Sequence, residues 1–361
     1  MKIAILNAHG PATGVGKCVY KAMDYFLEGG MDVTLFDLSY KGSGGYGHHI
    51  KRIKPFRLPV LRQCLNDLFY YPLHIPKGFD VYHISAQGGG AYLKYIGKNT
   101  VITVHDMIPV LKKNSMPGII NWISKRCITY AKKAGIIISD SEHTKRDIQN
   151  YFGIGDENIR IIPPAVDHDI FKPIGKRKYG ATEKIILHVG SEDDRKNVHL
   201  LIKAFHILLQ YMPNVRLYRI GKKSRKIARL INRLGINDKV LYFSDVSEEK
   251  LAGFYNNADV FVFPSSYEGF GIPPLEAMAC GCPVLSSSVT SLSEVVGDAA
   301  IKLKSLTAEE ICNGLILILS DTKLARKLSS KGLAHAKKFS WQNYARDLAK
   351  AYSDVFSRAS R

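Results

Sequence analysis

Two carboxylates, two glycines and two prolines stand close together in the stretch from Glu268 to Glu276. An apolar run before it predicts a buried strand, and Pro274 predicts the start of a helix. Such a helix start presents backbone N–H groups and a positive dipole end to a diphosphate, while Gly269 and Gly271 let the backbone approach a ligand. Glu276, expected in the first helical turn, could accept hydrogen bonds from both hydroxyls of a ribose, with Glu268 nearer the sugar.

Two adjacent cations, Arg195 and Lys196, follow a strand that is expected to end near Gly190. At the carboxyl end of a parallel sheet they could neutralise a diphosphate and the charge that grows on a leaving group. The simpler alternatives are two exposed bases after an acidic turn and, for the glutamate stretch, a turn and a helix with two solvated carboxylates. The bare spacing of the glutamates is weak evidence, whereas the composite of strand, glycines and prolines favours a nucleotide site.

The glycines Gly14 and Gly16 open an expected helix after the first strand. The segment fails the P-loop pattern, since Pro11 occupies the position of its first glycine and Cys18 the position of its Ser or Thr. The dinucleotide pattern fails as well, because Val19 stands where its last glycine should be. We therefore expect a flexible loop that approaches a phosphate or an acceptor.

His105 and Asp106 directly follow a buried strand, which puts them at the carboxyl edge of the expected sheet. A lone histidine is usually structural, but this place beside an aspartate favours a functional role. Asp140 and Ser141 also follow a strand, and because serine is a favoured N-cap residue we expect Ser141 to cap a helix.

Short apolar runs alternate with helical patterns along the whole chain. Most runs are apolar on both faces, as are the strands of a parallel sheet that helices cover. The expected strands are Lys2–Leu6, Val33–Leu38, Val81–Ser85, Val101–His105, Ile136–Ser139, Lys184–Val189, Val215–Ile220, Val240–Phe243, Val260–Pro264 and Val284–Ser286, and the clearest helices are Val198–Tyr211, Glu248–Asn256 and Thr307–Leu319. This order predicts an α/β protein with two Rossmann-like, doubly wound domains that face a cleft.

The domain boundary is visible in the composition. Pro163 and Pro164 end a run of strand-forming residues, and a stretch with several glycines and prolines separates them from the strand at Lys184. A chain of 361 residues also exceeds what one hydrophobic core usually organises. We expect an N-terminal domain over residues 1–164 and a C-terminal domain over residues 165–340.

The chain is strongly basic, with 51 Lys and Arg residues against 32 Asp and Glu residues and a net charge of +19. Such a charge attracts phosphate-bearing ligands, anionic membrane surfaces or nucleic acid, although it also serves simply as a solubilising surface. One basic cluster flanks an apolar run that contains Leu58 and Phe69, and this segment is expected either to rest on an anionic bilayer or to form a core helix with a charged outer face. The cluster consists of Lys51, Arg52, Lys54, Arg57 and Arg62.

The remaining composition is that of a reduced compartment. The six cysteines are scattered without metal-ligand spacing. No apolar run approaches the roughly 18 residues of a spanning helix, and the N-terminus lacks the apolar core of a signal peptide. We expect a cytoplasmic protein, or one that is peripheral at the inner face of the cell membrane.

The stretch from Glu268 to Ala279 resembles the signature of glycosyltransferase family 4, the retaining glycosyltransferases of GT-B architecture. The likeness covers nearly the whole chain. The matching segments are Val189–Asn197, which looks like the donor-phosphate loop, Ile162–Asp167, which looks like the domain linker, and Phe339–Trp341, which looks like the start of C-terminal helices. In the family those helices cross back, so the resemblance implies that a helix over about 341–361 packs on the N-terminal domain.

One position departs from the family pattern. Many relatives carry an arginine directly after the glycine, where this chain has Ser191. One phosphate contact is then either absent or supplied from elsewhere, and the candidates to supply it, beyond a later strand, are Lys222, Lys223 and Arg225.

The resemblance assigns roles residue by residue. The residues it implies in catalysis are His105, Arg195, Lys196 and Glu268, and those it implies in donor binding are Gly14, Gly16, Gly190, Gly269, Phe270, Gly271 and Glu276. In the family the histidine contacts the donor sugar. The family mechanism needs no essential metal, so no metal or other cofactor is expected.

The implied reaction transfers a hexosyl unit from a nucleoside diphosphate sugar, GDP-mannose or a UDP-hexose, to an acceptor hydroxyl with retention. The acceptor would be a glycan or a lipid-linked molecule, with an anionic membrane surface as a further expected partner and no nucleic acid. Another reaction of the same architecture, epimerisation or phosphorolysis, is an alternative. A catalytically silent, glycosyltransferase-like subunit that binds through its basic surface is the alternative from outside enzymes.

Overall fold

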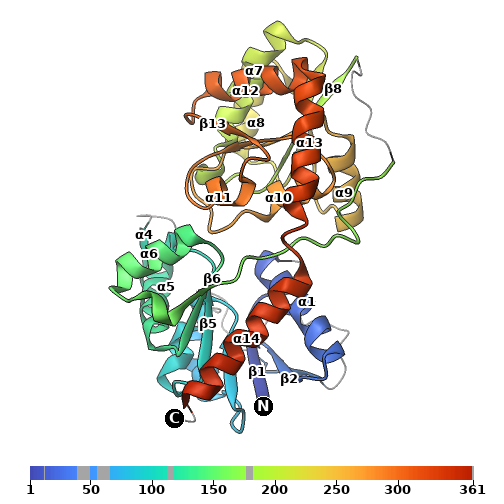
Figure 1. Cartoon of the computed structure of the whole chain (residues 1–361). Helices are drawn as coiled ribbons and strands as arrows, with labels where there is room; N and C mark the ends of the chain where they lie inside the picture. Colours follow the sequence, from blue (N-terminus) through green and yellow to red (C-terminus); the bar gives the residue numbers. More distant parts are fainter. Residues whose placement is uncertain (12, 39–48, 55–65, 112–117, 176–181, 360–361) are drawn as a thin grey trace. The chain divides into compact units, whose positions relative to one another are not determined.

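The computed structural model describes residues 1–11, 13–38, 49–54, 66–111, 118–175 and 182–359. The chain divides into two compact units (Figure 1). The first unit comprises Met1–Ala165 together with Trp341–Arg361, and the second comprises Val166–Ser340.

A parallel sheet forms the centre of the first unit. Its strands, in the order β3-β2-β1-β4-β5-β6-β7, are β1 (Lys2–Asn7), β2 (Asp32–Asp37), β3 (Ile50–Arg52), β4 (Val81–Ile84), β5 (Thr100–Val104), β6 (Ile136–Ser139) and β7 (Ile159–Ile161). All neighbouring strands run parallel. The chain moves outward from β1 in both directions, so the sheet is doubly wound and its central strands are covered on both faces.

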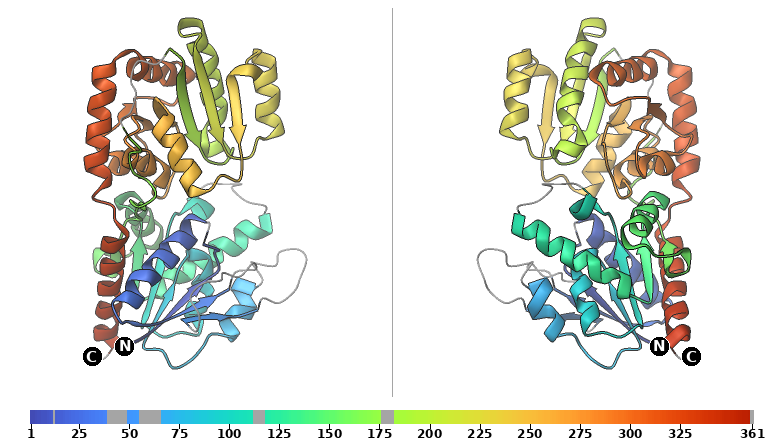
Figure 2. Two further views of the ribbon diagram at one scale, coloured as in Figure 1. Left: turned by 90° about the vertical axis from the view of Figure 1, so that its right-hand side faces the viewer. Right: turned by 90° about the vertical axis from the view of Figure 1, so that its left-hand side faces the viewer.

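Helices cover both faces of this sheet (Figure 2). Helices α1 (Gly14–Glu28) and α14 (Trp341–Ala359) pack with one set of strand side chains. The turn Gln87–Lys94 and helix α6 (Glu142–Phe152) pack with the other set. Helix α5 (Gly118–Tyr130) packs against the segment Gln87–Lys94. The shorter elements are α3 (Tyr71–Leu73), α4 (Ile108–Leu111), the π-helical turn Asn66–Tyr70 and the 3-10 turns Ala131–Lys133 and Asp156–Asn158.

The last helix belongs to the first unit through a buried polar contact as well as through packing. The hydroxyl of Tyr352 on α14 lies 2.8 Å from Nδ1 of His83 on β4, and Nε2 of the same ring lies 2.9 Å from the hydroxyl of Thr103 on β5. Burial lowers the pKa of His83 to about 3, so the ring is neutral and bridges the helix to two strands.

The second unit repeats the arrangement. Its strands, in the order β10-β9-β8-β11-β12-β13, are β8 (Lys184–Val189), β9 (Val215–Ile220), β10 (Val240–Phe243), β11 (Val260–Phe263), β12 (Val284–Ser287) and β13 (Ile301–Leu303), all parallel to their neighbours. Strand β11 shows why the sheet lies between two helical layers: Val260 and Val262 pack in one core, Phe261 and Phe263 in the other, and all are buried.

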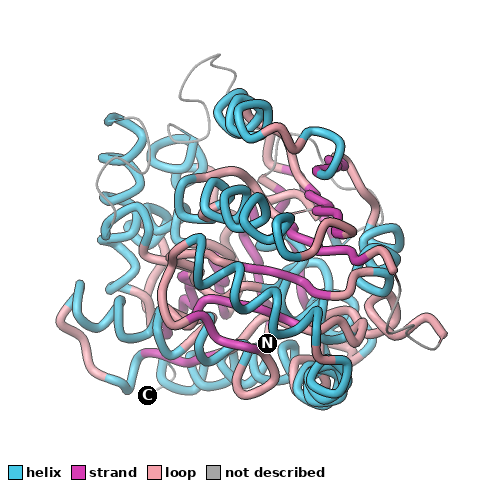
Figure 3. Tube along the Cα trace, turned by 90° about the horizontal axis from the view of Figure 1, so that it is seen from above, coloured by secondary structure: helices cyan, strands magenta, loops and turns pink. Residues whose placement is uncertain are grey.

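The helical layers of the second unit follow from this alternation, with strands between helices (Figure 3). On one face lie α7 (Val198–Tyr211), α8 (Arg225–Leu234) and α12 (Ala308–Ser320). On the other lie α9 (Glu248–Asn257), α10 (Ile272–Ala279) and α11 (Leu292–Val296). Helix α13 (Thr322–Ala336) packs on α10, and two short turns are Asp194–Lys196 and Asn237–Lys239.

The predicted fold class is confirmed: both sheets are parallel, doubly wound and covered by helices. Two edge strands, β3 and β13, were not predicted, because each has only three residues and too few apolar side chains for a strand pattern. Among the helices that the structure describes, none is long and apolar enough to cross a bilayer.

Candidate active site

Two glycines bring the loops after β8 and β9 together at the carboxyl edge of the second sheet. Gly190 has φ +143° and Gly221 has φ +145°, a region that side chains disfavour. A Cβ atom at Gly221 would lie 2.3 Å from the carbonyl oxygen of Gly190. Only glycine therefore fits at position 221. This close approach fixes the start of the segment from Gly190 to Lys196, which is called the 190–196 loop below.

The predicted cations of the 190–196 loop converge on one predicted carboxylate. Lys196 Nζ donates to Glu268 Oε1 at 2.6 Å, and Arg195 Nη1 donates to Glu268 Oε2 at 2.8 Å. Arg195 Nη1 also donates to the carbonyl oxygen of Tyr267 at 3.1 Å, and the carbonyl of Arg195 accepts from the N–H of Ser266 at 2.7 Å. The 190–196 loop and the loop that carries Glu268 are therefore bonded to each other through both side chains and backbone.

Burial makes this cluster electrostatically sensitive. Lys196 is 8% exposed and its Nζ lies 4.7 Å above the ring of Phe263. Burial lowers the pKa of Lys196, Glu268 opposes this shift, and the positive charge of Arg195 adds to it. The two cations and Glu268 by themselves carry a net positive charge, which attracts a diphosphate, and the exposed carboxylate of Asp193, 3.9 Å from Arg195 Nη2, offsets part of it.

Ser291 holds the loop around Glu268. Its hydroxyl lies 2.8 Å from the carbonyl oxygen of Glu268 and 3.0 Å from that of Phe270, and Phe270 is itself buried against Phe339. Gly271 has φ +107°, and a Cβ atom there would lie 2.6 Å from the side chain of Leu292. Gly269 lies between Glu268 and Phe270, whose carbonyl groups are both held by Ser291, so its position is set by these neighbours.

The start of α10 differs from the prediction. The helix begins at Ile272, not at Pro274, so Glu276 lies beyond its first turn. Proline has no N–H, so Pro273 and Pro274 remove two of the four donors that a helix start normally presents. The N-terminus of α10 therefore offers fewer backbone donors to a diphosphate than the sequence argument assumed, and the cations carry more of the electrostatic role.

Glu276 is buried, as a carboxylate that binds a ligand in a dry site would be. It is 5% exposed, and its Oε2 accepts a hydrogen bond of 3.0 Å from the hydroxyl of Tyr255 on α9. Burial, together with the negative charge of Glu276, raises the pKa of Tyr255 well above its ordinary value, so the phenol keeps its proton and donates. Glu268 is 8% exposed, and the alternative of two solvated glutamates is therefore wrong.

A buried arginine that the sequence analysis missed lies beneath the 190–196 loop. Arg219 on β9 is completely buried, and its Nη2 donates to the carbonyl oxygen of Gly190 at 3.2 Å. Its Nη1 contacts Nδ1 of His188 on β8. Burial, with the nearby charge of Arg219, lowers the pKa of His188 well below its ordinary value, so the imidazole is neutral and accepts this bond.

Glu192 supplies the opposite charge for this arginine from within the loop. Its Oε1 lies 3.7 Å from Arg219 Nη2 and accepts from the hydroxyl of Tyr242 at 2.7 Å, while its Oε2 accepts from the N–H of Ser224 at 2.7 Å. Lys223, a candidate replacement for the phosphate contact missing at Ser191, has its Nζ 5.1 Å above the ring of Tyr242. Arg219 could have been suspected from sequence, because it is a charged residue near the carboxyl end of a predicted strand.

In the first unit, His105 directly follows β5 and has a partner that differs from the expected one. Its Nδ1 lies 2.8 Å from Oδ2 of Asp140, which follows β6, and its Nε2 lies 2.9 Å from the carbonyl oxygen of Ser85, which follows β4. Asp106 instead accepts a hydrogen bond of 2.9 Å from the N–H of Ile108. Neighbouring strands bring Asp140 beside His105, a contact that sequence distance hides.

The protonation state of His105 follows from these two contacts. Both ring nitrogens face acceptors, and both can donate at once only when the ring is protonated, so these contacts favour the cation. Burial alone would lower the pKa of His105, but Asp140, through charge and hydrogen bond, and the carbonyl of Ser85 together raise it. With both N–H groups used, contact between the ring and a donor sugar would require replacing one of these partners.

His105 lines a cavity of about 520 Å³ at the carboxyl edge of the first sheet. Val15 of α1 and His9 also line it, and burial together with the charge of His105 lowers the pKa of His9 to about 4. The predicted glycines of this region, Gly14 and Gly16, lie in a helix rather than in a loop that could approach a ligand. Gly16 lies in the first turn of α1, where its N–H donates to the hydroxyl of Thr13 at 3.0 Å, and Gly14 begins the same helix.

Close packing, rather than flexibility, explains why residue 16 is glycine. A Cβ atom on Gly16 would lie 1.9 Å from the carbonyl oxygen of Gly10, whereas one on Gly14 would meet open space. The expected flexible loop is therefore wrong for these two residues. As predicted, Ser141 caps α6 by accepting from the N–H of Thr144 at 3.0 Å.

Comparison with known proteins adds independent findings. The family model described as Glycosyltransferase Family 4 matches residues 12–170, and the model described as Glycosyl transferases group 1 matches residues 171–335. Among solved structures, sucrose-phosphate synthase from Thermosynechococcus elongatus aligns with a TM-score of 0.81 at 21% identity, over 99% of this chain and 100% of that one. At that identity the likeness shows the fold alone.

Two curated relatives come from Escherichia coli. The serotype-specific mannosyltransferase WbdA is 32% identical over 263 residues, which are 68% of this chain but only 32% of that longer protein. The O-antigen chain mannosyltransferase B is 30% identical over 285 residues, which are 75% of this chain and 74% of that protein. Together with its two Rossmann-like sheets, these matches show that the chain belongs to the group 1, family 4 glycosyltransferases of GT-B fold.

Proposed function

We propose that this protein transfers a hexosyl unit, with retention, from a nucleoside diphosphate sugar to an acceptor hydroxyl. The observation that carries the proposal is the cluster of Arg195, Lys196 and Glu268, in which two cations from one loop meet a carboxylate from another. Lys196 and Glu268 are buried, and Arg195 is partly exposed. A diphosphate beside this cluster would gain two positively charged donors in a site that largely excludes water.

The proposed donor pose follows the arrangement of the second unit. The diphosphate lies beside Arg195 and Lys196, the ribose hydroxyls reach the buried carboxylate of Glu276, and the sugar lies near Glu268. Lysine carries three N–H donors and arginine five, so a bond to Glu268 does not prevent either cation from binding a phosphate. The donor we favour is GDP-mannose, since two relatives are named mannosyltransferases, and a UDP-hexose is the other candidate.

The proposed chemistry needs no protein nucleophile. The bond between the anomeric carbon and the phosphate oxygen breaks, the acceptor oxygen bonds to that carbon on the same face, and the acceptor proton passes to the departing phosphate. Arg195 and Lys196 stabilise the negative charge that grows on the phosphate as the bond breaks. His105, held by Asp140, lines the cavity of the first unit, where we place the acceptor side of the reaction.

We place the product in glycan, glycolipid or polysaccharide synthesis. For a lipid-linked acceptor, peripheral contact with an anionic bilayer is supported by two sets of exposed side chains. The basic ones are Lys51, Arg52 and Lys54, and the apolar ones are Phe69 and Leu73. Arg57, Arg62 and the part of the apolar run that contains Leu58 lie outside the described residues.

Thermal unfolding with a panel of UDP- and GDP-sugars tests the donor, and a product assay then tests transfer. A ligand at about 100 times its dissociation constant stabilises the folded state by about 2.7 kcal/mol, a shift of several degrees in Tm. We expect one nucleotide series to raise Tm and its sugar to appear in a glycosylated product. Binding of oligonucleotide with no stabilisation by any sugar nucleotide would replace the enzyme by the silent-subunit alternative.

A further inference from the structure

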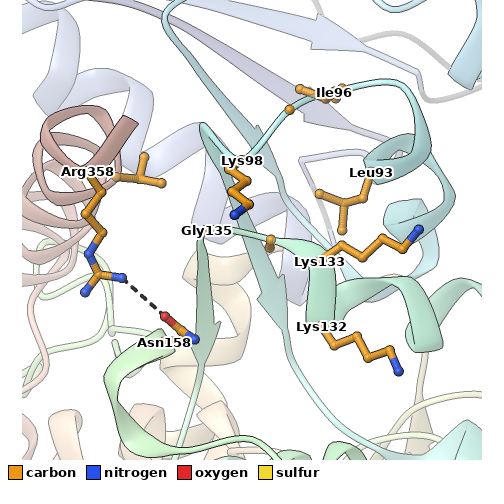
Figure 4. Close-up of a pocket in the computed structure, with 11 residues that line it drawn as sticks. Leu93, Ile96, Lys98, Lys132, Lys133, Gly135, Asn158 and Arg358 are labelled. Carbon is orange, nitrogen blue, oxygen red and sulfur yellow. Dashed lines mark hydrogen bonds between the residues drawn. The ribbon is translucent and has the colours of Figure 1, made fainter. Parts of the chain in front are cut away.

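A second cavity lies at the opposite edge of the first sheet from His105. It has a volume of about 610 Å³, and its lining includes Lys98, Gly135 and Asn158 (Figure 4). Gly135 and Asn158 immediately precede β6 and β7, and Lys98 lies two residues before β5, whereas His105 and Asp140 follow β5 and β6. The cavity is therefore formed at the amino ends of the strands, away from the candidate active site.

Positive charge dominates this cavity. Four basic side chains line it: Lys98, Lys132, Lys133 and Arg358. None of the described residues in its lining is acidic. The remaining lining includes apolar side chains such as Leu93 and Val355, so cationic and apolar groups line the cavity together.

The cavity is built from tightly packed backbone. A Cβ atom at Gly135 would lie 2.2 Å from the carbonyl oxygen of Lys98 and 2.5 Å from the side chain of Val355, so no larger residue fits there. Arg358 is held by uncharged partners: Nη1 donates to Asn158 Oδ1 at 3.3 Å, and Nη2 donates to the carbonyl oxygen of Glu157 at 3.2 Å. The guanidinium is thereby positioned, and neither hydrogen bond neutralises its charge.

Helix dipoles explain only part of this charge. Lys132 and Lys133 lie in the last turn of the segment after α5, and Arg358 lies in the last turn of α14. A helix carboxyl end carries about half a negative charge, so two such ends offset about one of the four cations. Lys98 lies outside any helix. Helix ends thus leave about three of the four positive charges in the lining without an offset.

We propose that this cavity binds a phosphate-bearing ligand, either a soluble phosphate ester or the headgroup of an anionic lipid. A phosphate monoester carries nearly two negative charges and several acceptor oxygens, which suits lysines and an arginine that approach from different elements. The apolar side chains of Leu93 and Val355 in the lining can contact the carbon-bearing part of such a ligand. The proposal goes beyond glycosyl transfer and does not depend on it.

The test compares charge reversals in the full-length chain. Lys132→Glu combined with Lys133→Glu changes the cavity, and Lys77→Glu combined with Lys350→Glu makes the same change at exposed lysines outside its lining. Binding of inorganic tripolyphosphate is measured by calorimetry at low salt with saturating GDP and UDP present. A second arm measures sedimentation with phosphatidylglycerol vesicles and with neutral phosphatidylcholine vesicles.

We expect the cavity variant to lose about tenfold or more in affinity for at least one probe, while the control pair changes it by less than about threefold. Loss confined to tripolyphosphate identifies a soluble ligand, and loss confined to anionic vesicles identifies a lipid headgroup. Equal losses in both variants, or no binding of either probe by the unmodified chain, would overturn the proposal. Should the cavity variant unfold, Lys132→Gln with Lys133→Gln replaces it in the same comparison. A missing glycosyl-transfer activity changes none of these outcomes.

Discussion

The hydroxyl of Tyr255 on α9 donates a 3.0 Å hydrogen bond to the buried carboxylate of Glu276 on α10. This contact fixes one oxygen of the carboxylate proposed to bind the ribose. Glu276→Ala should weaken binding of the free nucleoside diphosphate by about 1.5–3 kcal/mol and raise the KM for the donor, because a charge-assisted pair of hydrogen bonds is lost. Calorimetry on the folded variant measures the effect.

Tyr255→Phe is the matched control for this assignment, because it keeps the carboxylate and removes only its support. We expect a smaller loss of nucleotide affinity, about 0.5–1.5 kcal/mol, with kcat little changed. Unchanged nucleotide affinity in a folded Glu276→Ala variant would show that the ribose binds elsewhere.

Arg195 and Lys196 should act mainly in the transition state. Replacing both with alanine should lower kcat more than it raises the donor KM, because the charge on the leaving diphosphate grows as the glycosidic bond breaks. Steady-state kinetics at varied donor concentration separates the two terms. Lys203→Ala, an exposed position on α7, is the control for loss of one cation nearby. Full turnover in the double variant would move the phosphate contact to another group such as Lys223.

Arg219 should stabilise the 190–196 loop rather than contact a ligand, because its side chain is fully buried beneath Gly190. Arg219→Met leaves Glu192 without its ionic partner and should lower the free energy of unfolding by about 3–5 kcal/mol, measured by urea denaturation. Adding Glu192→Gln removes the uncompensated charge and should recover part of that loss. If the two substitutions are simply additive, Arg219 and Glu192 are not coupled.

The pair of His105 and Asp140 should make folding stability depend on pH. The folded pKa of His105 is raised above its ordinary value of 6.5. Its contribution to stability is therefore fully present below about pH 6.5 and is lost as pH rises through the folded pKa. Urea titrations at several pH values measure this effect. We expect the difference in unfolding free energy between the unmodified chain and His105→Gln to become smaller as pH rises above about 6.

The comparison with His105→Gln is needed because other histidines act in the opposite direction. Burial lowers the pKa of His9 to about 4 and of His83 to about 3, so these groups reduce stability as pH falls below about 6.5. Asp140→Asn should lower the pKa of His105 in an NMR titration. An unshifted His105 resonance in that variant would contradict the ion pair.

The basic segment near β3 should bind anionic membranes weakly. At about 1 kcal/mol for each basic residue near the surface, its five residues suffice for reversible binding at low salt. Co-sedimentation should increase with the anionic lipid fraction and fall with salt, and Lys51→Glu with Arg52→Glu should reduce it. Binding that ignores lipid charge and salt, or none at all, would leave a soluble acceptor as the remaining expectation.

The sequence alone determined the fold class and many of the elements, because apolar strands covered on both faces produce a local pattern. Helix α7, Val198–Tyr211, and strands β8 and β9 begin and end where the pattern predicts. The predicted residues Arg195, Lys196 and Glu268 also come together, since each follows a strand and the carboxyl ends of parallel strands meet at one edge of a sheet.

Tertiary structure alone decided the partners of these residues. Asp140 rather than Asp106 pairs with His105 because β5 and β6 are hydrogen-bonded neighbours, a relation that sequence spacing does not express. Likewise Arg219, Glu192 and Tyr255 bond to groups on other strands, loops or helices. The basic cavity at the amino ends of β5 to β7 also joins residues far apart in sequence, from Lys98 to Arg358. Periodicity reports which face of an element is buried, whereas contacts between elements depend on the order in which the strands are laid side by side.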